Sequence, residues 1–199
     1  MFNGIIYNQG IIKDIKKSAR YVSGSLVIEV SSDIKFKKTD IGESVCCDGV
    51  CLTLIRIKKK SFLFYLSKET LKRSNFKYSK IGNYINIEKS LLKGQKVSGH
   101  YVQGHVDSTA KVKKISFSDK TWVIKFELLN KKLHKYLIEK ASIAINGVSL
   151  TISNVANQYF EVNVIPHTLK LTNLKRLKSN NVVNVELDIF GKYILKLSK

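Results

Sequence analysis

The stretch Gly49-Val50-Cys51-Leu52-Thr53 returns as Gly147-Val148-Ser149-Leu150-Thr151, 98 positions further along a chain of 199 residues. A repeat with a fixed period is informative because each copy is expected to form one structural unit. The same offset relates three more pairs: Glu69-Thr70-Leu71 with His167-Thr168-Leu169, Asn75 with Asn173, and Ile85-Asn86-Ile87-Glu88 with Val183-Asn184-Val185-Glu186. The sequence therefore predicts an internal duplication.

The front ends of the two copies match as well, although their offset is 100 rather than 98. Phe2-Asn3-Gly4-Ile5-Ile6 corresponds to Val102-Gln103-Gly104-His105-Val106, so the alignment needs one two-residue gap. The polar, Gly-containing stretch Leu92-Lys93-Gly94-Gln95 is typical of a linker between the copies. The predicted units are 1–95, 96–190 and a C-terminal tail of 191–199.

Apolar and polar residues alternate with a period of two in both copies, which is typical of strands with one buried face. The alternating segments are 26–30, 62–66, 122–128, 160–164 and 183–187. Several short strands per copy, joined by Gly- and Asn-bearing turns, predict a small closed barrel. Short helices are expected only at 131–140 and 192–199. The only proline, Pro166, predicts the end of a strand, followed by a loop at His167-Thr168.

Composition favours a cytoplasmic protein without a membrane segment. Hydrophobic residues make up 44% of the chain, and no apolar run approaches the roughly 18 residues that a spanning helix needs. The first residues lack the basic and apolar regions of a signal peptide. The net charge of +20 raises the hypothesis of a nucleic-acid-binding protein. The lysines are spread along the whole chain, however, so we predict no nucleic-acid partner.

The cysteines predict neither a metal site nor a structural disulfide. Cys46, Cys47 and Cys51 lie close together, but no second Cys/His cluster completes a zinc site. A stable disulfide is not expected in a reducing compartment. A buried structural thiol is the alternative interpretation of Cys51.

Three repeated elements combine glycine with small hydroxyl or thiol groups, and we expect them to bind a ligand at one end of each barrel. They are the front segments around Gly4 and Gly104, the triplets beginning at Cys51 and Ser149, and the segments around Thr70 and Thr168. Uncharged polar groups of this kind suit a flat heteroaromatic ring with carbonyls and a polyol tail. The alternative interpretations are ordinary strand threonines at 53 and 151 and solvent-facing histidines at 100 and 105.

Six segments in order resemble the riboflavin synthases of the alpha-chain type over nearly the whole chain. They are Met1-Phe2-Asn3-Gly4-Ile5, Gly49-Val50-Cys51-Leu52-Thr53, Lys68-Glu69-Thr70-Leu71, Ser98-Gly99-His100-Tyr101-Val102-Gln103-Gly104-His105-Val106-Asp107, Asn146-Gly147-Val148-Ser149-Leu150-Thr151 and Ile165-Pro166-His167-Thr168-Leu169. The resemblance implies an all-β fold of two six-stranded Greek-key barrels with a short C-terminal helix, assembled as a homotrimer. Each of the two barrels is then a lumazine-binding domain.

The resemblance also implies a reaction without any cofactor. Two molecules of 6,7-dimethyl-8-ribityllumazine exchange a four-carbon unit and give riboflavin and 5-amino-6-(D-ribitylamino)uracil. Fixing two reactants face to face supplies much of such a rate enhancement, with effective molarities on the order of 10⁵ M or more. The family brings the N-terminal barrel of one subunit against the C-terminal barrel of the next. Lumazine synthase is a further partner that the resemblance raises.

By match to the family motifs, the implied catalytic residues are His105, Cys51 and Ser44, with His105 as the first choice for acid–base work. The residues implied to bind substrate are Gly4, Ile5, Ile6, Cys51, Leu52, Thr53, Tyr65, Leu66, Ser67, Lys68, Glu69, Thr70, Gly104, His105, Val106, Lys140, Ser149, Leu150, Thr151, Ile165, Pro166, His167, Thr168, Leu169, Lys170 and Asp188.

The chain departs from the family pattern at two places that bear on the site. Cys46-Cys47-Asp48 stands where a small apolar residue and Asn are more usual, and His167 stands where Glu is also common. The alternative function is a non-catalytic carrier of lumazine or flavin. Such a carrier is expected to lose the binding residues in one copy, whereas this chain keeps both sets.

Overall fold

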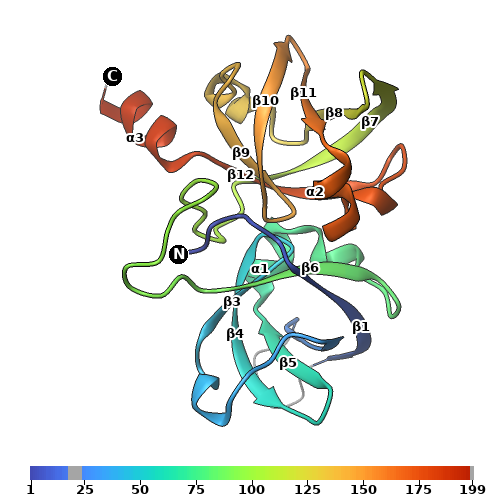
Figure 1. The fold of residues 1–199 in the computed structure, drawn as a ribbon, viewed down its shortest axis with the longest axis vertical. Coiled ribbons are helices and arrows are strands. Elements are labelled where there is room, and N and C mark those ends of the chain that lie inside the picture. Colours follow the sequence, from blue (N-terminus) through green and yellow to red (C-terminus); the bar gives the residue numbers. More distant parts are fainter. Residues whose placement is uncertain (18–23, 198–199) are drawn as a thin grey trace.

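The computed structural model describes residues 1–17 and 24–197, and its strands form two closed antiparallel barrels stacked on each other (Figure 1). The first barrel consists of β1 (Asn8–Lys17), β2 (Leu26–Ser32), β3 (Ser44–Cys47), β4 (Val50–Ile57), β5 (Ser61–Leu66) and β6 (Tyr84–Lys89). The second consists of β7 (Ser108–Ser118), β8 (Thr121–Leu128), β9 (Ser142–Ile145), β10 (Val148–Ala156), β11 (Tyr159–Val164) and β12 (Val182–Leu187). We call them barrel one and barrel two.

Both barrels have the same strand order, and this confirms the predicted fold class. Barrel one closes in the order β1-β2-β5-β4-β3-β6, and barrel two repeats it as β7-β8-β11-β10-β9-β12. In each barrel the second strand pairs with the fifth instead of the third, which is the Greek-key arrangement. Closure leaves no long unpaired strand edge. The five alternating segments of the sequence lie in β2, β5, β8, β11 and β12, as predicted.

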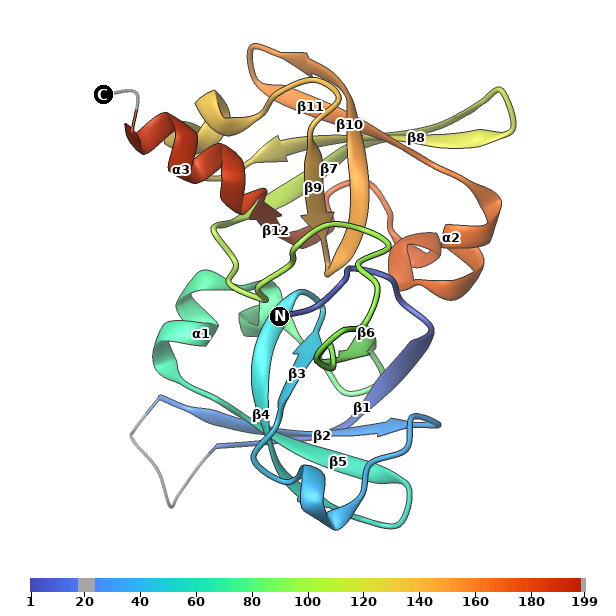
Figure 2. The same ribbon diagram turned by 60° about the vertical axis from the view of Figure 1, so that its left-hand side comes forward.

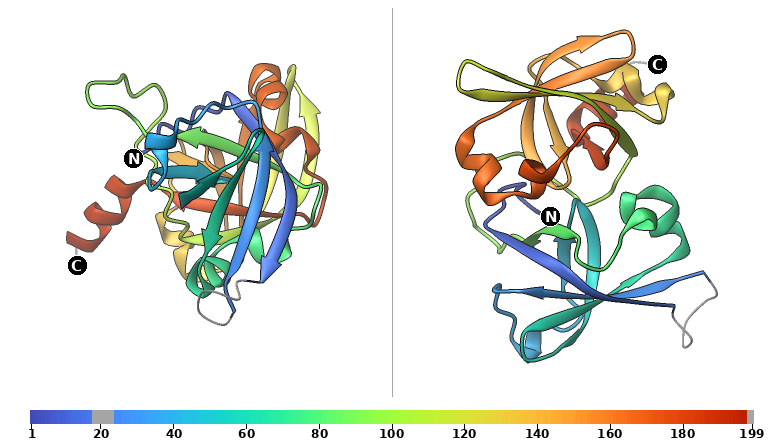
Figure 3. Two further views of the ribbon diagram at one scale, coloured as in Figure 1. Left: turned by 90° about the horizontal axis from the view of Figure 1, so that it is seen from below. Right: turned by 90° about the vertical axis from the view of Figure 1, so that its right-hand side faces the viewer.

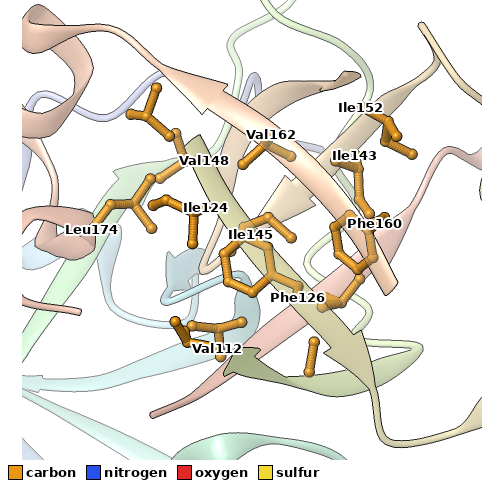
Figure 4. Packing of buried hydrophobic residues seen from close by; sticks show 14 of the residues in the cluster. Val112, Ile124, Phe126, Ile143, Ile145, Val148, Ile152, Phe160, Val162 and Leu174 are labelled. Atoms are coloured by element: carbon orange, nitrogen blue, oxygen red, sulfur yellow. The ribbon is translucent and has the colours of Figure 1, made fainter. Parts of the chain in front are cut away.

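Each barrel has its own apolar core, built from the inward-facing positions of its strands. In barrel two Phe126 and Phe160 stack with ring centroids 5.4 Å apart, and aliphatic side chains such as Ile145 and Val162 surround them (Figure 4). Burying one large apolar side chain stabilises the fold by roughly 1.5–3 kcal/mol. The outward-facing positions are thereby left free to serve the surface and the junction between the barrels.

The short helices differ from the prediction. The loop predicted at His167-Thr168 lies inside α2 (Pro166–Leu171), and the equivalent segment of the first copy forms α1 (Lys68–Arg73). Six residues are too few for a helical period to be recognised. Pro166 ends a strand as predicted, and it also takes the first helical position, where a missing N–H costs nothing.

Other helical segments also shift relative to the sequence. The helix expected at 131–140 is the 3₁₀-helix η3 (Lys131–Tyr136), and the tail helix α3 (Ile189–Leu197) begins earlier than 192. Positions 198–199 lie outside the described residues. Three further 3₁₀-helices are η1 (Lys38–Asp40), η2 (Asn75–Tyr78) and η4 (Asn173–Arg176). Helix α3 extends away from barrel two, as Figure 2 shows.

A buried network of amides joins the barrels about an approximate twofold axis. The side-chain amide of Asn86 donates to the backbone oxygen of Asn146 at 2.9 Å, and that of Asn184 donates to the oxygen of Asp48 at 2.7 Å. Within each barrel, the side-chain oxygens of Asp48 and Asn146 accept the N–H of Asn86 and Asn184 at 2.7 and 2.8 Å, which holds these amides in place. Such a satisfied polar network fixes one relative placement of the two barrels.

Two glycines meet at the centre of this junction. Gly49 and Gly147 have φ angles of +78° and +77°, and a Cβ atom on Gly49 would lie 2.7 Å from the backbone nitrogen of Gly147. Only glycine combines this backbone conformation with so close an approach. The strictly repeated Gly-Val dipeptide of the sequence is therefore explained by the contact between the copies.

Candidate functional site

The front segments of the two copies are exchanged between the barrels. The backbone oxygen of Gly4, from the first copy, accepts the N–H of Ser149 in β10 at 2.8 Å. The oxygen of Gly104, from the second copy, accepts the N–H of Cys51 in β4 at the same distance. Each glycine also lies so close to its partner that a Cβ atom would approach it to 2.7 Å.

The side chains that follow these glycines confirm the exchange. Ile6 is buried in the core cluster of barrel two, and Val106 packs against that of barrel one. Phe2 and Val102 form an antiparallel bridge between the two segments. The predicted binding residues therefore sort into two groups. Site one combines β4, β5 and α1 with Gly104–Val106, and site two combines β10, β11 and α2 with Gly4–Ile6.

Two glutamates, the half-buried Glu88 and the buried Glu186, hold the exchanged segments. Both oxygens of Glu88 accept N–H groups, from Asn3 at 2.8 Å and from Gly4 at 3.0 Å. Glu186 accepts those of Gln103, Gly104 and His105 at 2.6 to 3.0 Å. Burial raises the pKa of each carboxyl group to about 7, while the N–H donors act in the opposite direction. The repeated Asn-x-Glu of the sequence thus positions the front segments.

Site one contains a cavity that could hold a ligand. A cavity of about 410 Å³ lies between β4, α1 and the 104–107 segment, a volume suited to a small organic ligand. Its predicted lining residues are Cys51, Glu69, Thr70, Gly104, His105 and Val106, and its further lining residues are Val50, Arg73, Ser74, Asp107, Asn130 and Leu133. Cys51 is half-buried and His105 is exposed. The first two predicted catalytic side chains therefore reach the same cavity.

Site two contains a histidine that the sequence analysis did not select. Nδ1 of His100 lies 2.7 Å from the hydroxyl oxygen of Ser149. Burial lowers the pKa of His100, and the negative charge of Asp188 offsets part of this shift. His100 precedes the second front segment, and only its place in the motif Ser98–Asp107 could have indicated it. Asp188, a predicted binding residue, thereby joins site two.

The comparisons with known proteins agree with this architecture. The family model of the lumazine binding domain matches the chain twice, over residues 3–90 and 103–188. Riboflavin synthase of Photobacterium phosphoreum is 35% identical over 99% of this chain and 88% of that protein. Riboflavin synthase of Escherichia coli is 35% identical over 94% of this chain and 87% of its own length.

The chain belongs to the riboflavin synthase family. Among solved structures, LumP in complex with riboflavin has a TM-score of 0.81 at 24% identity, over 94% of this chain and 99% of that one. LumP in complex with flavin mononucleotide has a TM-score of 0.79 at 25% identity with the same coverage. The sequence-based family assignment is thus confirmed, together with the duplicated barrel.

The other predicted residues of this riboflavin synthase relative occupy several kinds of position. On the outer face of barrel one, Ser44 pairs with Thr53 across β3 and β4, and both are exposed. Thr151 pairs with Ser142 in the same way in barrel two. Lys140 lies in barrel two, ahead of β9; its side chain is 76% exposed, and its Nζ lies 4.0 Å from a carboxyl oxygen of Glu139.

Several predicted residues of the family motifs have buried side chains. Leu52, Leu66 and Leu169 lie in the barrel cores. Leu150 packs against the core of barrel two. Any contact of the three core leucines with a ligand must run through the backbone. The polar members surround the helix starts: Ser67 accepts the N–H of Thr70 at 3.1 Å. The remaining predicted residues of these segments are half-buried or exposed: Ile5, Tyr65, Lys68, Ile165, Pro166, His167, Thr168 and Lys170.

A second, larger hollow of about 920 Å³ lies between the barrels near η2 and η4. It contains none of the predicted site residues, and its floor is formed by the amide network around Asp48 and Asn173. Size alone therefore does not identify the functional site of this family member. Among the described residues, no group of His, Cys, Asp and Glu could hold a metal ion. No helix among them is long and apolar enough to cross a membrane.

Proposed function

We propose that the chain is a riboflavin synthase. It converts two molecules of 6,7-dimethyl-8-ribityllumazine into riboflavin and 5-amino-6-(D-ribitylamino)uracil by transfer of a four-carbon unit. The observation that carries the proposal is the retention of both sites: each has its strand triplet, its helix start and its exchanged glycine segment. A reaction between two identical substrates needs two similar sites, and the internal duplication supplies them.

The side chains divide into those that position substrate and those that move protons. Thr53 and Thr70 at site one, with Thr151 and Thr168 at site two, offer hydroxyl groups to ring carbonyls and ribityl oxygens. His105 accepts or donates the proton at the reacting ring, and Cys51 lies in the same cavity. Burial keeps His100 neutral near pH 7, so its ring nitrogen holds the Ser149 hydroxyl in place.

The reaction is tested by incubating the protein with 6,7-dimethyl-8-ribityllumazine alone and following absorbance. One riboflavin should form for every two lumazines consumed. His105→Ala should lower kcat by roughly 100-fold, the usual contribution of a positioned acid–base group. Cys51→Ser, which copies the residue at the equivalent position of the second copy, should have a smaller effect. Lumazine binding, measured by fluorescence titration, should stay within about threefold of the parent protein, since a group that acts mainly in the transition state contributes little to ground-state binding.

One result would contradict the assigned reaction, and a second would revise only the role of His105. Lumazine that binds and fluoresces without forming riboflavin would identify a non-catalytic carrier, the alternative function raised by the sequence. An unchanged kcat in His105→Ala would remove His105 from the chemistry while leaving the reaction assigned.

We further propose that the enzyme acts as a homotrimer. Helices α1 and α2, which mark the two sites, lie on opposite sides of the molecule in Figure 2 and in the right-hand view of Figure 3. Two lumazines bound to one chain would therefore lie on opposite sides of the molecule. This supports an assembly in which site one of one copy faces site two of another copy, the arrangement that the family resemblance implies.

Helix α3 offers a surface for this assembly. Its exposed apolar side chains are Phe190, Tyr193, Ile194 and Leu197, each more than half exposed. Lys192 anchors the helix to Asp107 at 2.9 Å, beside the segment that carries His105. Exposed apolar faces of this kind mark association surfaces. A cytoplasmic location and docking with lumazine synthase stay predictions.

The double variant Ile194→Lys/Leu197→Lys should reduce the mass measured by light scattering from that of a trimer to that of a monomer. Turnover should fall with it, whereas each chain should still bind lumazine. Lys196→Ala on the same helix is the matched control and should leave both mass and turnover unchanged. A double variant that remains trimeric would show that α3 does not hold the assembly.

A further inference from the structure

Cys46 and Cys51 lie directly opposite each other on β3 and β4. The N–H of Cys51 points away from its cross-strand partner, to the oxygen of Gly104 at 2.8 Å. The two cysteines therefore form a pair without backbone hydrogen bonds between them, the closer of the two antiparallel arrangements, in which Cα atoms are typically about 4.5 Å apart. This separation lies within the range of about 4.4–6.8 Å that a disulfide bond spans.

The two thiols have different surroundings on the same face of the sheet. Cys46 is 1% exposed and packs beneath Phe2 and Val102 at the junction of the barrels, and Cys51 packs against this cluster. Cys51 also lines the site-one cavity, where a small oxidant can reach it. Cys47 points to the opposite face, into the core of barrel one, and its cross-strand partner is Val50 rather than Cys51.

We propose that Cys46 and Cys51 form a reversible disulfide that withdraws the Cys51 thiol from site one when the protein meets a disulfide oxidant. This inference rests on the proposed function, because it assigns a redox control to the same site. It makes Cys46, which binds no substrate, a modification site of the chain.

Oxidised glutathione can form this disulfide by two steps of thiol–disulfide exchange. The thiolate of Cys51 attacks one sulfur of glutathione disulfide, forming a mixed disulfide and releasing one glutathione thiolate. Cys46 then loses its proton to water and attacks the Cys51 sulfur, which releases the second glutathione. Two protein thiols are oxidised, and one glutathione disulfide is reduced to two thiols. Burial, followed by the charge of Glu88, raises the pKa of Cys46, so the second step is the slow one and accelerates with pH.

The internal duplication shows that only one site carries this pair. Barrel two has Ala144 and Ser149 at the equivalent paired positions, and Ala144 is buried at the junction just as Cys46 is. Oxidation would therefore disable one of the two substrate sites, which suffices to stop a reaction that needs both. The second copy also supplies conservative replacements, Cys46→Ala and Cys51→Ser.

The test exposes the native protein to graded ratios of reduced and oxidised glutathione, followed by denaturation, alkylation and intact mass measurement. The parent chain should lose two hydrogens and keep one alkylatable thiol, and Cys47→Ala should lose two hydrogens and keep none. Cys46→Ala should instead carry glutathione on Cys51. Turnover of the parent should fall in proportion to the oxidised fraction and return with dithiothreitol. Cys46→Ala should retain the activity of the reduced parent when untreated.

The remaining outcomes overturn the proposal. Absence of an internal disulfide at every ratio would refute the pairing, as would a disulfide that persists in Cys46→Ala. A disulfide that forms without loss of turnover would refute the control of site one. A reduced protein that produces no riboflavin refutes the proposed function instead, and the mass measurement still decides the pairing.

Discussion

Replacing Asp48 by asparagine is expected to stabilise the folded protein by on the order of 5 kcal/mol near pH 7.5. Asp48 is buried at the junction of the barrels, and burial raises the pKa of its carboxyl group to about 8. One carboxyl oxygen accepts the N–H of Asn86 at 2.7 Å and the amide of Asn173 at 2.9 Å. An asparagine oxygen can accept both bonds, and it carries no charge that burial would penalise.

The pH dependence of this gain follows from proton linkage. In the unfolded chain the Asp48 carboxyl group titrates near the ordinary aspartate pKa of 3.8, and in the folded chain its pKa is about 8. Between these values the folded state holds one more proton, so the free energy of unfolding decreases as the pH rises. The advantage of Asp48→Asn should be small near pH 4, grow up to about pH 8, and stay constant above it.

Urea denaturation at several pH values measures this difference. The matched control is Asn146→Asp, which places a second carboxyl group at the equivalent position of the other copy and should cost a similar free energy with the same pH profile. Equal stability of Asp48→Asn and the parent chain at about pH 7.5 would mean that the Asp48 carboxylate is ionised without penalty.

Replacing Gly49 by alanine is expected to destabilise the protein by more than about 3 kcal/mol, the sum of backbone strain and a steric clash at the junction. The residue has a φ angle of +78°, and the added methyl group would lie 2.7 Å from the backbone nitrogen of Gly147. Backbone atoms cannot turn aside as a flexible side chain does. The two barrels must therefore separate, which breaks the amide network around Asn86 and Asn184.

Gly42→Ala separates the two causes. Gly42 also has a positive φ of +98°, but no atom lies within 4 Å of the position of an added Cβ. The Gly42→Ala variant should therefore have a free energy of unfolding only about 1 kcal/mol below that of the parent protein, the cost of the backbone conformation alone. Thermal or urea unfolding of both variants tests the comparison. A Gly49→Ala protein as stable as Gly42→Ala would show that the junction adjusts to the extra methyl group.

The architecture could be predicted from the sequence because each strand buries alternate side chains in a barrel core, and because the same pattern occurs in both copies. Ile124 and Phe126 face a core, and Glu127 between Phe126 and Leu128 does not, so alternation identified β8 directly. Six of the residues that line the site-one cavity were found through motifs, Cys51 and His105 among them, whereas others such as Arg73 and Asn130 were not. The constant offset between the copies located their counterparts in site two.

What the sequence could not predict depends on contacts between distant segments. The change of offset from 98 to 100 indicated that the front ends differ, but it did not show that Gly4 lies on barrel two and Gly104 on barrel one. His100 has no counterpart in the first copy, so the repeat gave it no signal. The helix that begins at Pro166 has six residues, too few for a helical pattern of apolar residues to be recognised in the sequence. The raised pKa of Asp48 follows from its burial at the junction, and the sequence alone did not show that burial.

The exchange of front segments makes the peptide linker part of the binding sites. A fragment that ended after residue 95 would contain β4, β5 and α1, yet it would lack the Gly104–Val106 segment that completes their cavity. The tether through residues 90–101 keeps each half at a high local concentration for the other. After cleavage of that tether, the two halves would have to associate as separate chains. Formation of the cavity would then depend on protein concentration, even though every residue of the cavity would still be present.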